Sequence, residues 1–147
     1  PSDGLTAFLD RAARTLGPGP LCLVMAEDGA EIASTVRHAL RAGFRRVILL
    51  SPPGLPLPAD LDAPGVAARL DRVPFDVHAE NAMPRAVNAL IDAAPGRWIH
   101  WCWNAEYLFH PFCETRRVGE MLAFHAEERR EAMLTYVVDL YADDLAA

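Results

Sequence analysis

Hydrophobic positions along the chain follow two spacings, and each predicts a different kind of element. Mainly apolar runs of strand length occupy residues 21–25, 47–50, 98–103 and 133–140. Between them, apolar residues recur every three or four positions, the spacing of one helical face. This second spacing predicts helices over residues 5–16, 32–42 and 83–94, and another from Thr115 onward. Apolar strands alternating with helices indicate an α/β fold: a mostly parallel sheet with helices on both faces.

The region between residues 51 and 78 carries weaker signals. Residues 51–58 contain four prolines, which excludes a helix or a central strand and predicts a loop over the sheet edge. Residues 65–70 are interpreted as a short helix, and 75–78 as a weak strand. No internal repeat or linker interrupts the pattern, so we expect one domain over residues 1–147.

Composition narrows the function classes. The 147 residues are 52% hydrophobic and 23% charged, as in ordinary globular proteins. A net charge of −6 argues against a general nucleic-acid-binding protein. All 14 basic residues are arginine, so a phosphate-loop lysine and a Schiff-base lysine are both excluded. The Gly-rich dinucleotide motif and the Gly-x-Ser-x-Gly motif are also absent from the sequence.

Three cysteines form no disulfide-scaffold pattern, and reduced thiols in a cytoplasmic setting are the expectation. No apolar run reaches the roughly 20 residues that a transmembrane helix needs, so we expect no transmembrane segment.

Acidic side chains follow two of the predicted strands. Glu27 and Asp28 come after the first, and Asn104 and Glu106 after the tryptophan-rich run that ends at Trp103. The carboxyl ends of parallel strands share one edge, where α/β proteins bind nucleotides, so these residues are expected to meet there. An alternative is that Glu27 and Asp28 only cap the next helix, where negative charge is favourable.

From about Leu21 to Leu145 the chain resembles the nucleotide-binding half of the inverting glycosyltransferases of family 2, which have the Rossmann-like GT-A fold. The resemblance rests on an acidic turn after the first strand (residues 26–28), a glycine before the second (residues 42–44) and a strand-end motif at residues 103–108 with Pro111. Residues 136–141 resemble the strand that follows the metal motif in one bacterial branch of that family.

This resemblance implies binding of a nucleoside diphosphate sugar through Mg²⁺ or Mn²⁺ and transfer of the sugar to an acceptor hydroxyl. Glu106 would hold the metal, and Asp139 would support acid or base chemistry. Glu27, Asp28 and Asn104 would lie near the substrate.

Arg116 follows the motif closely and could bind a phosphate through its bidentate guanidinium. A solvated charged helix face is the alternative reading of that position.

Trp103 and Ala105 stand where the family motif has its two aspartates. The alternative is therefore a glycosyltransferase-like binding or accessory domain that is catalytically inactive. A further alternative is a zinc site built from His100, Cys102, His110 and Cys113, since histidine and cysteine are the ligands that zinc prefers. Oligomeric state is left open by the sequence.

Overall fold

The computed structural model describes residues 4–12 and 14–140. Its centre is a sheet of four parallel strands in the order β3-β2-β1-β4. The strands are β1 (Leu21–Met25), β2 (Arg46–Ser51), β3 (Leu70–Pro74) and β4 (Ile99–Trp103). The predicted α/β class with a parallel sheet is confirmed.

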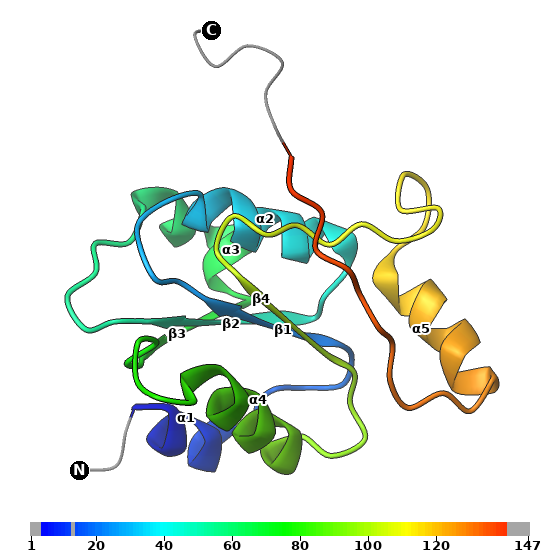
Figure 1. The fold of residues 1–147 in the computed structure, drawn as a ribbon, viewed down its shortest axis with the longest axis horizontal. Coiled ribbons are helices and arrows are strands. Elements are labelled where there is room, and N and C mark those ends of the chain that lie inside the picture. The colour runs from blue at the N-terminus through cyan, green and yellow to red at the C-terminus, as the bar shows by residue number, and fades with distance from the viewer. Residues whose placement is uncertain (1–3, 13, 141–147) are drawn as a thin grey trace, which may run out of the picture.

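Helices cover both faces of this sheet (Figure 1). Helices α1 (Gly4–Ala12) and α4 (Ala82–Ala93) lie on one face; α2 (Ile32–Ala42), the 3₁₀ helix η1 (Ala59–Asp62) and α3 (Pro64–Ala67) lie on the other. Helix α5 (Val118–Glu127) stands to the side and packs Val118 and Leu122 into the α2 layer. Among the described residues, none of the helices has the length and apolar character needed to cross a bilayer.

The two core layers follow from the alternation of side chains along each strand. All five residues of β1 are buried: Leu21, Leu23 and Met25 belong to the α1/α4 layer, whereas Cys22 and Val24 belong to the α2 layer. Because both faces of β1 are covered, every position of this strand must be apolar, which is why its sequence signal is strong.

The third strand differs from the prediction. It spans Leu70–Pro74, not residues 75–78, and residues 59–67 form η1 and α3 in place of one helix over 65–70. β3 is an edge strand, and only Leu70 and Val73 in it are buried. Its inner residues Asp71 and Arg72 are charged, so no apolar run marks this strand in the sequence. Asp71 pairs with Arg46 of the neighbouring strand.

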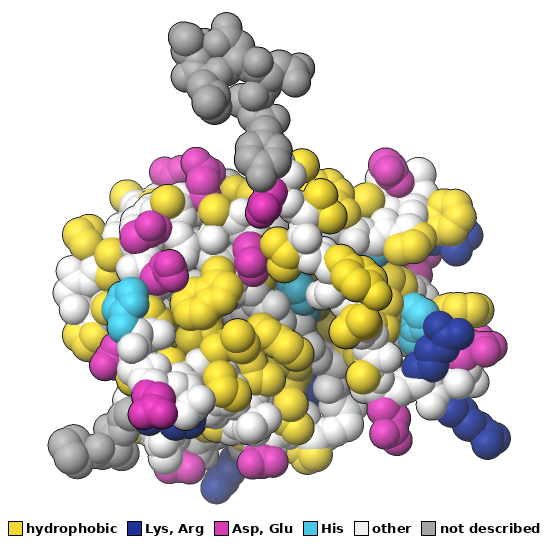
Figure 2. All heavy atoms as spheres, viewed as in Figure 1, with side chains coloured by type: hydrophobic (Ala, Val, Ile, Leu, Met, Phe, Trp, Pro, Cys, Tyr) yellow, Lys and Arg dark blue, Asp and Glu magenta, His cyan; other side chains and the backbone are white. Residues whose placement is uncertain are grey.

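The predicted last strand, residues 133–140, forms no strand, and all of these residues are exposed. Leu134, Tyr136 and Leu140 each expose about four fifths of their surface. Figure 2 shows hydrophobic side chains gathered on the face that this segment crosses in Figure 1. Residues 141–145, the last part of the stretch that resembles family 2, lie outside the described residues.

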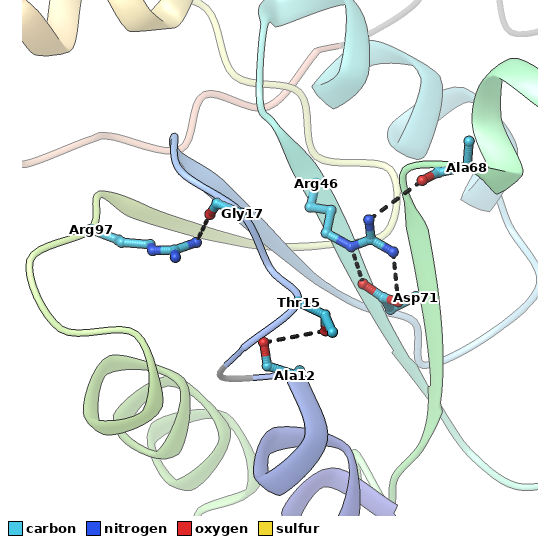
Figure 3. A network of polar contacts seen from close by, with 7 residues as sticks. All are labelled: Ala12, Thr15, Gly17, Arg46, Ala68, Asp71 and Arg97. Atoms are coloured by element: carbon cyan, nitrogen blue, oxygen red, sulfur yellow. Dashed lines mark hydrogen bonds and ion pairs between the residues drawn. The ribbon is translucent and has the colours of Figure 1, made fainter.

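Polar contacts fasten the amino-terminal edge of the sheet, opposite the predicted site (Figure 3). The Arg46 guanidinium donates two hydrogen bonds to Asp71, at 2.6 and 3.0 Å, joining β2 to β3. Arg97, just before β4, donates to the Gly17 carbonyl in the loop before β1. These contacts therefore join the starts of the strands, whereas Glu27, Asp28 and Glu106 lie at the opposite, carboxyl edge of the sheet.

Candidate functional site

The candidate site lies at the carboxyl ends of β1 and β4, which are adjacent in the sheet. From β1 the chain continues through α2 to β2 on one side, whereas β4 lies on the other side. This change of direction is a topological switch point, where the loops leaving two strands separate and open a crevice. Glu27, Asp28, Asn104 and Glu106 lie in those two loops, as the sequence predicted.

Asn104 ties the two loops together. Its Oδ1 accepts a hydrogen bond from the Glu27 backbone N–H at 3.1 Å. Its Nδ2 donates to Asp28 Oδ1 at 2.7 Å and to the Ala30 carbonyl at 2.9 Å. Asp28 Oδ1 also accepts from the Ala30 N–H at 2.8 Å, which closes a turn before α2. The side chain of Asn104 is therefore committed to the protein.

Glu106 folds back onto the end of its own strand. Its Oε2 accepts a hydrogen bond from the Trp103 N–H at 2.7 Å, and its own N–H donates to the Trp103 carbonyl at 3.3 Å. Between them Ala105 adopts a left-handed conformation with φ of 63°, and its N–H donates to Thr35 Oγ1 of α2 at 2.9 Å. Among the described residues, no protein donor bonds to Glu106 Oε1, and Glu106 lines the hollow described below.

Helix α2 supplies contacts that the sequence did not single out. The Ser34 hydroxyl lies 2.8 Å from the Tyr107 hydroxyl and donates to Glu31 Oε2 at 2.5 Å. One turn later, His38 Nε2 lies 2.8 Å from the Leu108 carbonyl oxygen. Polar residues three or four apart on a helix share one face, so Ser34 and His38 could have been grouped from sequence. Their partner segment could not.

Glu27, Asp28, Ala30 and residues 103–106 line a hollow of about 340 Å³, named here the acidic hollow. Its lining carries three carboxylates and no basic side chain. Within the described residues, these carboxylate oxygens do not converge within 4.8 Å as a group of three. The geometry therefore suits one or two carboxylates acting together with a ligand, and not an all-protein cage.

Two other predicted site residues lie elsewhere. Arg116 is exposed, and its guanidinium stacks 5.3 Å from the centroid of the Phe112 ring. Asp139 lies in the exposed stretch after α5. Neither residue lines the acidic hollow.

A second cluster lies within the α2 layer of the core. The ligand atoms of Cys22, His100 and Cys102 all lie within 4.8 Å of one another, so this group could hold a metal ion. Of the four residues predicted to bind zinc, the structure brings together His100 and Cys102. His110 and Cys113 stay outside this group, and Cys22 of the neighbouring strand takes part in their place.

The two thiols of this cluster have opposite pKa shifts. The hydrogen bond with Cys22 lowers the pKa of Cys102 to about 6; His100 adds to this effect, while burial and the Glu106 carboxylate oppose it. The same hydrogen bond, together with complete burial, raises the pKa of Cys22. The hydrogen bond between the two thiols is thus the largest cause of both shifts, downward for Cys102 and upward for Cys22.

Comparison of the chain with protein-family models, with curated proteins and with solved structures finds no match.

Proposed function

We propose that the chain is a glycosyltransferase-like domain that binds a nucleoside diphosphate sugar in the acidic hollow. The observation that carries this proposal is the meeting of Glu27, Asp28, Asn104 and Glu106 at the switch point between β1 and β4. Open parallel sheets bind nucleotides at that point. The first four strands of a dinucleotide-binding sheet have the same order, 3-2-1-4.

Charge supports a metal-assisted mode of binding. Three carboxylates repel a bare diphosphate, and the hollow offers no arginine to offset them. A hard cation such as Mg²⁺ or Mn²⁺ is commonly held by one or two carboxylates together with phosphate oxygens. Glu106, whose Oε1 has no hydrogen-bond donor among the described residues, is the proposed ligand. When bound, the cation would neutralise charge on the departing diphosphate.

Transfer of the sugar to an acceptor hydroxyl is the further part of the proposal, and it comes from the family resemblance. Asp139 is the proposed acid or base and Arg116 the proposed phosphate-binding residue. Since both lie outside the lining of the acidic hollow, transfer requires them to approach the bound donor.

The hydrogen bonds that Asn104 makes within the protein favour a second candidate, a binding domain that does not transfer the sugar. Both ends of its amide are used within the protein, and Ala105 offers no side-chain ligand. Such a domain would bind the nucleotide and leave the donor sugar intact.

Calorimetric titration with uridine and guanosine diphosphates, with and without Mn²⁺, tests the proposal. We expect Mn²⁺-dependent binding that Glu106→Gln weakens at least tenfold and that Glu127→Gln, at the exposed end of α5, leaves unchanged. Metal-independent binding that Glu106→Gln does not alter would reject the assigned site. Release of sugar from a bound donor would then separate a transferase from a binding domain.

A further inference from the structure

The Cys22–His100–Cys102 cluster is built across two adjacent strands. Cys22 on β1 lies directly opposite His100 on β4, and Cys102 comes two residues later on β4. Positions two apart on a strand share one face, so all three side chains belong to the same core layer. Within it Cys22 is fully buried, Cys102 is 7% exposed, and the His100 ring stacks on Phe44 with their centroids 5.6 Å apart.

The spacing of the ligand atoms is close to that of a loaded site. Zinc bonds of about 2.3 Å to sulfur and 2.0–2.1 Å to nitrogen place tetrahedral ligand atoms roughly 3.3–3.8 Å apart. The three atoms here lie within 4.8 Å of one another before any ion is bound.

The donor chemistry also distinguishes this cluster from an ordinary core. A buried cysteine usually behaves as a small apolar residue, but here two thiols meet one imidazole. Two thiolates neutralise a divalent cation, so the loaded site would carry no net charge into the core. Thiolate and imidazole ligands select zinc over the hard cations.

The position of β4 provides an entry route. It is an edge strand, and His100 is half-buried, so an ion can approach from the imidazole side. Among the described residues, the group contains no fourth side-chain ligand, which leaves one position for water.

We propose that Cys22, His100 and Cys102 form a zinc-binding site that ties the edge strand β4 to β1. The ion stabilises the strand pair whose carboxyl ends carry the acidic hollow. This site does not depend on nucleotide binding, since it uses a soft donor set in the core, whereas the acidic hollow offers carboxylates.

Cobalt substitution tests the proposal, because Co²⁺ occupies zinc sites and gives an intense absorption band when thiolates bind it. The full chain, freed of metal by a chelator and kept reduced with a phosphine, is titrated with Co²⁺ and then with Zn²⁺. We expect one Co²⁺ per chain, a thiolate band, and loss of that band on addition of Zn²⁺. Mg²⁺ and Mn²⁺ should leave it unchanged.

Matched variants assign the band to the cluster. His100→Gln, at a half-buried position, and Cys102→Ser should each weaken zinc binding by at least roughly tenfold. Cys113→Ser, which removes the free thiol outside the cluster, should keep the wild-type band. Circular dichroism of the metal-free variants checks that each is folded.

Three results would overturn the site: absence of a thiolate band in the wild type, loss of the band in Cys113→Ser, or full zinc affinity in a folded His100→Gln variant. None of them bears on Glu106, so failure of this site and failure of the nucleotide site are separate outcomes.

Discussion

Replacement of Asn104 by alanine should release the loop after β1 from the loop after β4. The change removes three hydrogen bonds, to the Glu27 N–H, Asp28 Oδ1 and the Ala30 carbonyl. All three are exposed, so water recovers part of each bond, and values near the lower end of the usual range apply. About 0.5 kcal/mol for each backbone bond and about 1 kcal/mol for the carboxylate bond give a loss of about 2 kcal/mol.

A second variant tests the direction of the bonds. Asn104→Asp keeps the acceptor for the Glu27 N–H but replaces the donor to Asp28 with a second carboxylate. Like charges at that distance repel, so this nearly isosteric change should cost at least as much stability as alanine. Asn88→Ala, on an exposed position of α4, is the matched control and should be neutral or slightly stabilising.

Urea denaturation followed by tryptophan fluorescence measures these differences as shifts in midpoint at constant slope. The two Asn104 variants should also bind nucleoside diphosphate more weakly than the wild type, because the acidic hollow loses its fixed shape. A cost below about 0.5 kcal/mol for Asn104→Ala, or wild-type stability for Asn104→Asp, would show that this amide does not hold the loops together.

Three further perturbations have defined outcomes. Thr35→Val removes the acceptor for the Ala105 N–H and should lower the free energy of unfolding in urea by about 1–2 kcal/mol. Thr35→Ser keeps the hydroxyl and should retain most of that free energy. Equal losses in both variants would contradict the role of the hydroxyl. Ala105→Gly should raise the free energy of unfolding by about 0.5–1 kcal/mol, since glycine adopts a φ of 63° without strain; a decrease would refute this. The third concerns pH: Cys102 has a pKa of about 6 when folded against an ordinary 9.0, so its contribution is complete above pH 9 and is lost as the pH falls through 6. The free energy of unfolding of the metal-free protein should therefore rise from pH 6 to pH 9 more steeply in the wild type than in Cys102→Ser, and equal slopes would contradict a lowered pKa at Cys102.

Sequence alone located the strands that are written as apolar runs, the edge strand β4 included, and the helices with a clear apolar face. β1 is apolar at every position because helices cover it on both sides, and α2 ends at Gly43, whose φ of 107° suits glycine. β3 was misplaced because an edge strand needs few apolar residues. There the Arg46–Asp71 ion pair supplies contacts that hydrophobic periodicity does not reveal.

The run at 133–140 shows the converse limit. Its residues have the composition of a strand, but a strand also requires a partner, and hydrophobic periodicity carries no information about pairing. Trp101 on β4 is half exposed for the same reason: β4 is an edge strand, and the sequence does not show which strands pair with it.

The two candidate sites differ in how much of their residue set could be predicted from the sequence. The acidic hollow was predictable, because the rule that parallel strands share a carboxyl edge brings Glu27 to Glu106 without knowledge of register. The metal-ligating cluster required register: only the alignment of Cys22 with His100 brings the thiol of β1 beside that of Cys102. Cys22 is far in sequence from the β4 residues, so spacing along the chain did not predict this pairing. Spacing instead grouped His100 and Cys102 with the nearby His110 and Cys113 as a zinc site. Because Cys102 lies two residues before Asn104, a metal ion on the cluster would hold the end of β4 that leads into Asn104 and Glu106 of the acidic hollow. Zinc loading should therefore tighten nucleotide binding.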